Sequence, residues 1–372
     1  MDLFAHPVLS AWFRRKEVCV VGLGKSGLAA AAFLKRLGAR VSVTEKQPRQ
    51  KAAKWVRELP PGVFCETGSH RLLRRSWDLL VISPGVPAEV WKPHAAAGRM
   101  VWGEMELGYR ALSLAGRWPR RAAAVTGTNG KTTTTALLGE ICRAAGFHTV
   151  VAGNIGTPLC AVAHRLDAGA ALVLEVSSYQ LETACAFHPA AGVVMNVTPD
   201  HLKRHRTMKN YAEAKFRLFQ NFLPEETAVL NAADPWCRRL ARTVPGKIFW
   251  FGRAAERRGR PGVFFDGKRL RAAVPGGRAV WDPPRYLRGY HNVENAMAAA
   301  ACGLALGAGG AAVRKSFERF RGVEHRLEEV RCRNGVHFVN DSKATNVDST
   351  AVALRSFVGG LHLILGGQDK GS

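Results

Sequence analysis

Short apolar runs alternate with helical patterns along most of the chain. Strand-like runs lie at 18–21, 41–44 and 79–82, and further runs lie at 122–125, 171–176 and 192–197. Helical patterns fall between them, one ending at Leu37 before the cap residue Gly38 and another covering 134–145. Because strands separated by helices form parallel sheets, this order predicts an α/β protein.

The pattern changes in the later part of the chain and indicates domain boundaries. Gly, Pro and Arg are frequent between 245 and 284, where turns and short strands are expected, and a helix is predicted over 292–306. Beyond residue 322 the pattern predicts a strand at 336–339, a helix at 349–357 and a strand at 361–365. With a linker-like stretch at 115–121, we expect three domains, over 1–117, 118–322 and 323–372. The third is expected to be incomplete, because it falls short of the ~100–150 residues usual for a domain.

A glycine-rich turn between a predicted strand and a predicted helix carries the most specific chemistry. It reads Thr126-Gly127-Thr128-Asn129-Gly130-Lys131-Thr132-Thr133. Backbone N–H groups of such a turn and the positive end of the helix dipole attract an anion. Lys131 can contact β- and γ-phosphates, and the Thr132 hydroxyl can ligate Mg²⁺. Val125 stands where longer phosphate-binding loops have glycine, so this is the shorter Gly-x-x-Gly-Lys-Thr form. It predicts a nucleoside triphosphate site rather than a surface turn that happens to contain a lysine.

A second glycine-rich turn, Gly22-Leu23-Gly24-Lys25-Ser26-Gly27, joins the first strand to an Ala-rich helix. This spacing in a strand–turn–helix context binds a diphosphate without indicating whose. Glu45, after the second strand, can bind a ribose or another polar group. Ser83-Pro84-Gly85 forms a turn at the carboxyl end of a further strand, where ligands of a parallel sheet bind.

More polar side chains are predicted at the corresponding edge of the second domain. Glu175 ends one strand and can ligate Mg²⁺, although a strand-end carboxylate can equally join a surface ion pair. His201 is either a ligand or a structural histidine, and Asp200 can cap the following turn. Lys215 lies within a predicted helix, where a solvated or ion-paired lysine is the simpler interpretation.

Two asparagines and one polar loop complete the candidates. Asn292 and Asn295, three residues apart, share a helix face, where they can bind a base or simply cap and hydrogen-bond. The loop at 340–346 follows a predicted strand and is denser in polar groups than a plain turn.

Composition narrows the class of protein. Apolar residues make up 47% of the chain, enough for sizeable cores, and no apolar run approaches the ~20 residues of a membrane span. The N-terminus lacks a signal-peptide pattern. The eight cysteines are scattered with no Cys-x-x-Cys spacing, which indicates reduced core residues of a cytoplasmic protein. The net charge of +25 suits nucleic acid, an anionic membrane surface or polyanionic substrates, but the sequence has no basic arm or aromatic-interleaved basic strand, so nucleic acid is not expected.

Taken in order, these motifs resemble those of the Mur ligases, the muramyl-peptide ligase family, and most of all its D-glutamate-adding branch. The likeness covers nearly the whole chain. Besides the two glycine-rich turns and Ser83-Pro84-Gly85, its pieces are Gly153-Asn154-Ile155-Gly156, 175–182, Asp200-His201-Leu202, 211–215, 291–296, 324–328, 340–346 and 366–370. The ordered set is far more specific than any single motif.

The resemblance implies an ATP- and Mg²⁺-dependent ligase. Its expected parts are a Rossmann-like N-terminal domain, a central P-loop ATPase-type parallel-sheet domain and a partial Rossmann-like C-terminal domain. Its expected substrates are UDP-N-acetylmuramoyl-L-alanine and D-glutamate. ATP would phosphorylate the alanyl carboxylate to an acyl phosphate, which the amine of D-glutamate attacks with release of phosphate. We expect a cytoplasmic monomer with no nucleic-acid partner.

The resemblance also implies residue roles. Catalytic roles fall to Lys131, Glu175, His201, Lys215 and Lys343. Mg²⁺ would be held by Thr132, Glu175, His201 and Lys215, the last as a carbamate. ATP would be bound by Gly127, Thr128, Asn129, Gly130, Lys131, Thr132, Thr133, Asn292, Asn295, Arg326 and Asp341. The substrates would be bound by Gly24, Lys25, Ser26, Ser83, Asn154, Thr345 and Lys370.

One position departs from the family pattern. The usual Asp two residues after His201 is Lys203 here, which affects the expected contacts of that loop rather than the metal ligands. The alternatives are a Mur or folylpolyglutamate-type ligase acting on another amino acid, and a non-catalytic nucleotide-binding remnant. Intact Lys131, Glu175, His201 and Lys215 argue against the remnant. A dehydrogenase is disfavoured because no nicotinamide site is apparent elsewhere.

Overall fold

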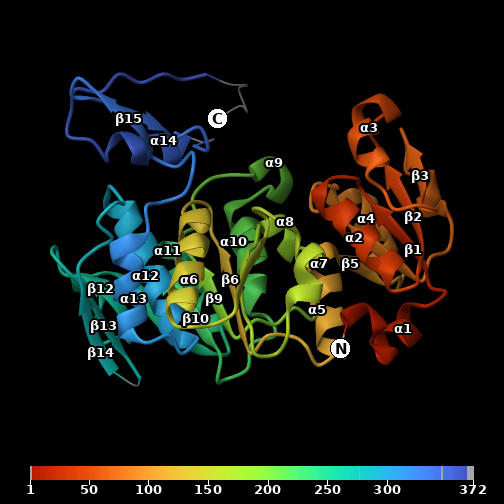
Figure 1. Ribbon diagram of the computed structural model, residues 1–372, viewed down its shortest axis with the longest axis horizontal. Coiled ribbons are helices and arrows are strands. Elements are labelled where there is room, and N and C mark those ends of the chain that lie inside the picture. Colours follow the sequence, from red (N-terminus) through yellow and green to blue (C-terminus); the bar gives the residue numbers. More distant parts are fainter. Residues whose placement is uncertain (1, 276, 345–346, 367–372) are drawn as a thin grey trace.

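The computed structural model describes residues 2–275, 277–344 and 347–366, which form three sheets with flanking helices (Figure 1). The first sheet is parallel, with strand order β3-β2-β1-β4-β5. Its strands are β1 (Glu17–Val21), β2 (Arg40–Glu45), β3 (Phe64–Thr67), β4 (Leu79–Ile82) and β5 (Val101–Gly103). The helices of this region are α1 (Pro7–Phe13), α2 (Lys25–Arg36), α3 (Arg49–Arg57), α4 (Ala88–Ala96) and α5 (Glu104–Leu114).

The second sheet has the order β14-β13-β12-β11-β10-β9-β6-β8-β7. It is parallel from β7 to β12 and antiparallel at β13 and β14. Its strands are β6 (Arg121–Thr126), β7 (Thr149–Gly153), β8 (Ala171–Glu175), β9 (Ala191–Val194), β10 (Thr227–Asn231), β11 (Lys247–Arg253), β12 (Gly262–Phe265), β13 (Leu270–Val274) and β14 (Gly277–Trp281). Its helices are α6 (Lys131–Ala144), α7 (Leu159–Val162), α8 (Ser178–Leu181), α9 (Leu202–His205), α10 (Met208–Phe216), α11 (Pro235–Leu240), α12 (Tyr290–Ala305) and α13 (Gly310–Arg319).

The last described part is small. It consists of the antiparallel pair β15 (Glu328–Arg333) and β16 (Val336–Asn340), followed by α14 (Val347–Leu354). In Figure 1 this part lies above helices α6, α11 and α12. No helix in the described chain is long and apolar enough to cross a bilayer.

The core of the second sheet explains how its candidate loop is positioned. Helices α6, α12 and α13 pack against one another and share a buried cluster with the sheet. Ala296 and the run at 298–301 are fully buried in α12, and such small side chains let the helix approach its neighbours closely. This packing fixes α6, and with it the turn that precedes Lys131.

The mixed α/β architecture with parallel sheets is as predicted, and the strand at 79–82 is predicted to the residue. Two predicted strands differ from the structure. The run at 192–197 leaves the sheet after Val194. The run at 361–365 forms no strand and pairs with none of the described strands. Ile364 in that segment is 96% exposed. The strand β15 was not predicted.

Candidate active site

The turn between β6 and α6 adopts a backbone that requires glycine at two positions. Gly127 has φ +148°, and a Cβ there would lie 2.7 Å from the Cβ of Met195. Gly130, the N-cap of α6, has φ +82°, and a Cβ there would collide with Oδ1 of Asn295. The turn therefore packs closely on the end of β9 and on α12, and it presents the N-terminus of a 14-residue helix to a ligand.

Neighbouring side chains hold the same turn from the other side. Asn196 accepts from the backbone N–H of Thr128 at 3.0 Å through its carbonyl oxygen, and from that of Asn129 at 2.9 Å through its side chain. The Thr128 hydroxyl lies 3.2 Å from the hydroxyl of Tyr211, on α10. Asn196 has no role in the predicted set, because the predicted strand at 192–197 included it, whereas β9 ends at Val194.

Two lysines converge on one carbonyl oxygen in this turn. Nζ of Lys131 donates to the Gly127 oxygen at 2.9 Å and to the Thr128 oxygen at 2.7 Å. Nζ of the buried Lys215 donates to the same Gly127 oxygen at 2.8 Å. Burial lowers the pKa of Lys131, and it lowers the pKa of Lys215 well below its ordinary value, with the Lys131 charge lowering the latter further. A lysine in this position is therefore poised to lose its proton, unlike the solvated lysine that sequence alone favours.

A buried carboxylate lies close enough to Lys131 to stabilise its charge. Glu175 is 1% exposed at the end of β8, and its Oε1 accepts from Nδ2 of Asn154 at 3.0 Å. Its Oε2 is buried and has no hydrogen-bond partner among the described residues. A buried anionic oxygen without a partner is costly unless a cation completes it, so Glu175 fits a ligand of Mg²⁺ better than a surface ion pair.

His201 stands at the start of α9 with φ +54°, and its side chain is 47% exposed. Its Nδ1 lies 3.1 Å from the Tyr179 hydroxyl, and its Nε2 lies 3.6 Å from Oδ2 of Asp200. The ring of Tyr211 contacts the His201 ring at 6.2 Å between centroids and lies 4.2 Å from Nζ of Lys215. Tyr211 thus connects His201 to the lysines. Lys203 is exposed on the same short helix.

The described residues contain no cluster of three or more His, Cys, Asp and Glu side chains placed to hold a metal ion. Glu175 and His201 would therefore need ligands of other types. Thr132 supplies one, a buried hydroxyl at the start of α6. Its Oγ1 accepts from Nη2 of Arg326 at 3.1 Å, so this arginine reaches the phosphate-binding turn from a distant part of the chain.

Arg326 also borders a cavity of about 370 Å³ beside the turn. Both predicted asparagines line this cavity, and both are buried. Nδ2 of Asn292 donates to the Arg288 carbonyl at 2.8 Å, and Nδ2 of Asn295 donates to Oδ1 of Asn292 at 3.0 Å. Oδ1 of Asn295 in turn accepts from the hydroxyl of Thr134 at 3.3 Å. The asparagines thus form hydrogen bonds within the protein and still face a space suited to a ligand.

Of the remaining predicted residues of the C-terminal part, the structure describes Asp341 and Lys343. Asp341 lines the same cavity and accepts at Oδ1 from the Leu327 N–H at 3.1 Å, and burial raises the pKa of its carboxyl group. Lys343 is exposed nearby, with its backbone N–H bonded to the His325 carbonyl. Thr345 and Lys370 lie outside the described residues.

The first glycine-rich turn forms a separate site on the first sheet. Gly24 caps α2, Lys25 is exposed at its first residue and Ser26 is half-buried next to it. The Ser83 hydroxyl donates to the Gly22 carbonyl at 2.7 Å. Glu45 accepts from the Leu23 N–H at 2.6 Å, so its carboxylate supports the turn itself, a role that the sequence did not predict.

Comparison with known proteins identifies the class. The family model of the Mur ligase middle domain matches residues 125–303, and that of the MurD-like N-terminal domain of Mur ligases matches residues 16–101. The chain is 43% identical to the UDP-N-acetylmuramoylalanine--D-glutamate ligase of Koribacter versatilis, over 96% of this chain and 79% of the relative. The chain belongs to the Mur ligase family. It is also 44% identical to the ligase of the same name from Pelotomaculum thermopropionicum, over 97% of this chain and 79% of the relative.

Solved structures of the family share the fold. MurF from Acinetobacter baumannii aligns with a TM-score of 0.56 at 19% identity, over 93% of this chain and 69% of that one. The UDP-N-acetylmuramate-alanine ligase MurC from Thermotoga maritima aligns with a TM-score of 0.55 at 19% identity, over 92% of this chain and 77% of that one.

Proposed function

We propose that this chain is an ATP-dependent ligase that joins D-glutamate to UDP-N-acetylmuramoyl-L-alanine during peptidoglycan precursor synthesis in the cytoplasm. The names of its relatives supply the substrates. The observation that carries the proposal is the convergence on one helix N-terminus of Lys131, Lys215, the incompletely paired Glu175 and Arg326. Such a set suits a reaction in which negative charge moves between phosphate and carboxylate.

The phosphate-binding turn would hold ATP. Backbone N–H groups of Gly127 and of Gly130 to Thr133, together with the α6 dipole, would bind the phosphates. Thr128 and Asn129, whose N–H groups bond to Asn196, would shape the turn between them. Lys131, now bonded to two carbonyls of the turn, would exchange them for phosphate oxygens. Asn292 and Asn295 would contact the adenine in the adjoining cavity, and Arg326 and Asp341 would contact ATP from its far side.

Thr132, Glu175 and His201 fit Mg²⁺, and Lys215 would join them as a carbamate. Bound there, Mg²⁺ would neutralise charge on the phosphates. Carbamylation needs a neutral amine, which attacks the carbon of CO₂ and releases a proton. The buried position of Lys215 favours the neutral form. The product is an anionic oxygen ligand of the kind that Mg²⁺ prefers.

In the proposed reaction the alanyl carboxylate takes the γ-phosphoryl group and becomes an acyl phosphate. The amine of D-glutamate attacks its carbonyl carbon, and phosphate leaves as the amide forms. Lys343, Thr345 and Lys370 would bind the incoming amino acid, and Asn154 would contact the sugar-peptide. Gly24, Lys25, Ser26 and Ser83 would hold the uridine diphosphate. We assign these functions to domains at 1–117, 118–322 and 323–372, acting as a monomer without a nucleic-acid partner.

Phosphate release tests the proposal. ATP, Mg²⁺ and UDP-N-acetylmuramoyl-L-alanine would be incubated with the protein and with D-glutamate, L-glutamate, L-lysine or meso-diaminopimelate in turn. Release that depends on D-glutamate is expected. The isosteric Glu175→Gln should abolish it, whereas Glu225→Gln, at an exposed position, should not.

The other outcomes separate the alternatives. Release with a different amino acid would place the chain among the neighbouring ligases of the superfamily. Absence of release with every amino acid, with the nucleotide-sugar still bound in calorimetry, would favour a non-catalytic binding protein.

A further inference from the structure

One partly buried polar bridge joins the turn after β4 to the neighbourhood of His201, and none of the roles above uses it. We propose that Arg204 is a positioning residue: it ties the turn at 83–86 to the Tyr179–His201 pair and so sets the nucleotide-sugar site relative to the candidate metal site. The inference deepens the proposed function and rests on it for the identity of the nucleotide.

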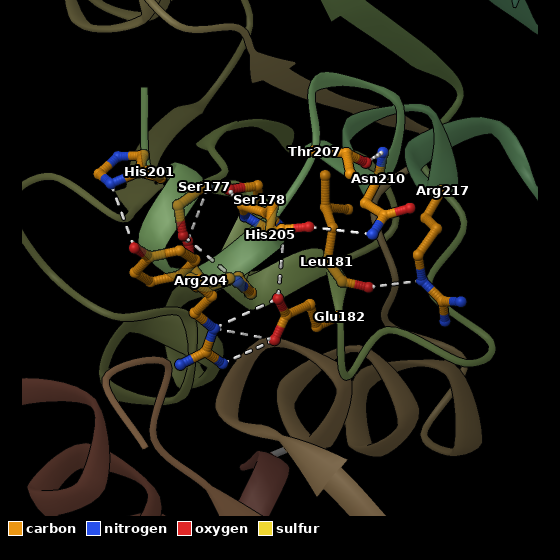
Figure 2. A network of polar contacts seen from close by, with 12 residues as sticks. Ser177, Ser178, Leu181, Glu182, His201, Arg204, His205, Thr207, Asn210 and Arg217 are labelled. Carbon is orange, nitrogen blue, oxygen red and sulfur yellow. Dashed lines mark hydrogen bonds and ion pairs between the residues drawn. The ribbon is translucent and has the colours of Figure 1, made fainter. Parts of the chain in front are cut away.

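The guanidinium of Arg204 is held in one orientation. It forms a forked ion pair with Glu182, with Nη2 at 2.6 Å from Oε2 and Nε at 3.2 Å from both carboxylate oxygens (Figure 2). Both side chains are largely buried, at 13% and 14% exposed. A paired planar fork of this kind is strong and directional, and a lysine cannot reproduce it.

The remaining arm of Arg204 reaches the turn that follows β4. Nη1 donates to the carbonyl of Val86 at 2.8 Å, across 118 residues of sequence. Val86 closes the turn through its N–H, which bonds to the Ser83 carbonyl at 3.0 Å. Its side chain packs so tightly on Gly22 that a Cβ at Gly22 would lie 2.7 Å from it. The bond to Val86 therefore acts on the turn and on the first residue of the glycine-rich motif together.

The same guanidinium also lies over the ring of Tyr179, which contacts His201. Its Cζ lies 4.5 Å from the centroid of the Tyr179 ring, and the Tyr179 hydroxyl lies 3.1 Å from Nδ1 of His201. Loss of an outer contact that orients a ligating histidine typically lowers metal affinity or activity by about 10- to 100-fold. Arg204 thus contacts residues that support both candidate sites. A small displacement between reacting groups is enough to slow a reaction severely.

The principal test is the double variant Arg204→Met with Glu182→Gln, which removes the bridge without leaving a buried carboxylate unpaired. Calorimetry with UDP alone should show a Kd raised about tenfold, as expected for loss of a charged hydrogen bond. Turnover should require about tenfold more Mg²⁺, while KM for ATP stays within about twofold of its original value. Arg204→Lys should show smaller changes in the same direction, and it serves if the double variant does not fold.

The control is Glu89→Gln. It breaks the pair between Arg206, at the end of α9, and Glu89 on α4, which also joins the two parts of the molecule but is exposed and 3.9 Å long. This variant should leave the UDP Kd and the Mg²⁺ requirement unchanged.

The outcomes separate this inference from the proposed function. Variants that lose thermal stability but keep the original UDP Kd and Mg²⁺ requirement would reduce Arg204 to a structural role and overturn the inference. Absence of D-glutamate-dependent turnover in the unmodified protein would refute the proposed function, while the UDP measurement would still test Arg204. Failure of the unmodified protein to bind UDP would overturn the inference directly.

Discussion

At the scale of single residues, surroundings rather than residue type decide the chemistry of the lysines on α10. Lys215 is buried against the Gly127 carbonyl and beside the charge of Lys131, whereas the Lys209 side chain, on the same helix, is 67% exposed. Desolvation disfavours the ammonium form of Lys215 and lowers its pKa. The two lysines should therefore differ in their reaction with CO₂.

We predict that Lys215 carries a carbamate when CO₂ is supplied. In ¹³C-bicarbonate buffer a carbamate resonance should appear near neutral pH, where an exposed lysine is still protonated. The signal should strengthen as pH rises, because deprotonation supplies the attacking amine. Lys215→Arg should abolish the resonance and Lys209→Arg should preserve it. A resonance that survives Lys215→Arg would assign the carbamate elsewhere.

At the scale of an element, a glycine with positive φ flanks each end of α6, but the two glycines have different neighbours. Gly130 before the helix and Gly146 after it have φ +82° and +84°. A Cβ at Gly130 would collide with Asn295, whereas a Cβ at Gly146 meets nothing within 4 Å. The pair therefore separates the cost of the backbone conformation from the cost of the contact with α12.

We predict that Gly130→Ala impairs ATP binding and Gly146→Ala does not. Each substitution should lower the free energy of unfolding by about 1 kcal/mol through its positive φ. Gly130→Ala should also displace the turn from Asn295 and weaken ATP binding at least about tenfold. Isothermal calorimetry and urea unfolding measure the two effects. Equal ATP affinities in both variants would contradict a role for close packing between the turn and α12.

At the scale of the whole molecule, the sequence predicts most of what depends on local pattern. The strand at 79–82 and the turn before Lys131 are examples, since alternation, glycine spacing and the helix start are all local signals. Contacts between distant segments were missed, among them the bond from Arg204 to Val86 and the support that Glu45 gives to Leu23. The apolar run at 361–365 was predicted as a strand and forms none. Its residues favour a strand, but a strand also needs a pairing partner, which its own residues do not specify.

One such long-range contact should make the free energy of unfolding of the whole protein depend on pH. Glu104, at the start of α5, is buried, and its Oε1 accepts from the Cys160 N–H at 2.6 Å. Its Oε2 has no hydrogen-bond partner among the described residues. Burial raises the pKa of this carboxyl group from 4.5 to about 7. The folded state therefore binds the proton more tightly than the unfolded state does.

Stability contributed by the Glu104 proton is complete below about pH 4.5 and is lost as pH rises through about 7. A shift of this size corresponds to about 3 kcal/mol. Glu104→Gln, which is neutral at every pH, should therefore match the original protein near pH 5 and exceed its free energy of unfolding by about 2–3 kcal/mol near pH 8. Urea unfolding at both pH values measures the difference, with Glu225→Gln as the exposed control. If Glu104→Gln stabilised the protein by the same amount at both pH values, packing rather than ionisation would be responsible.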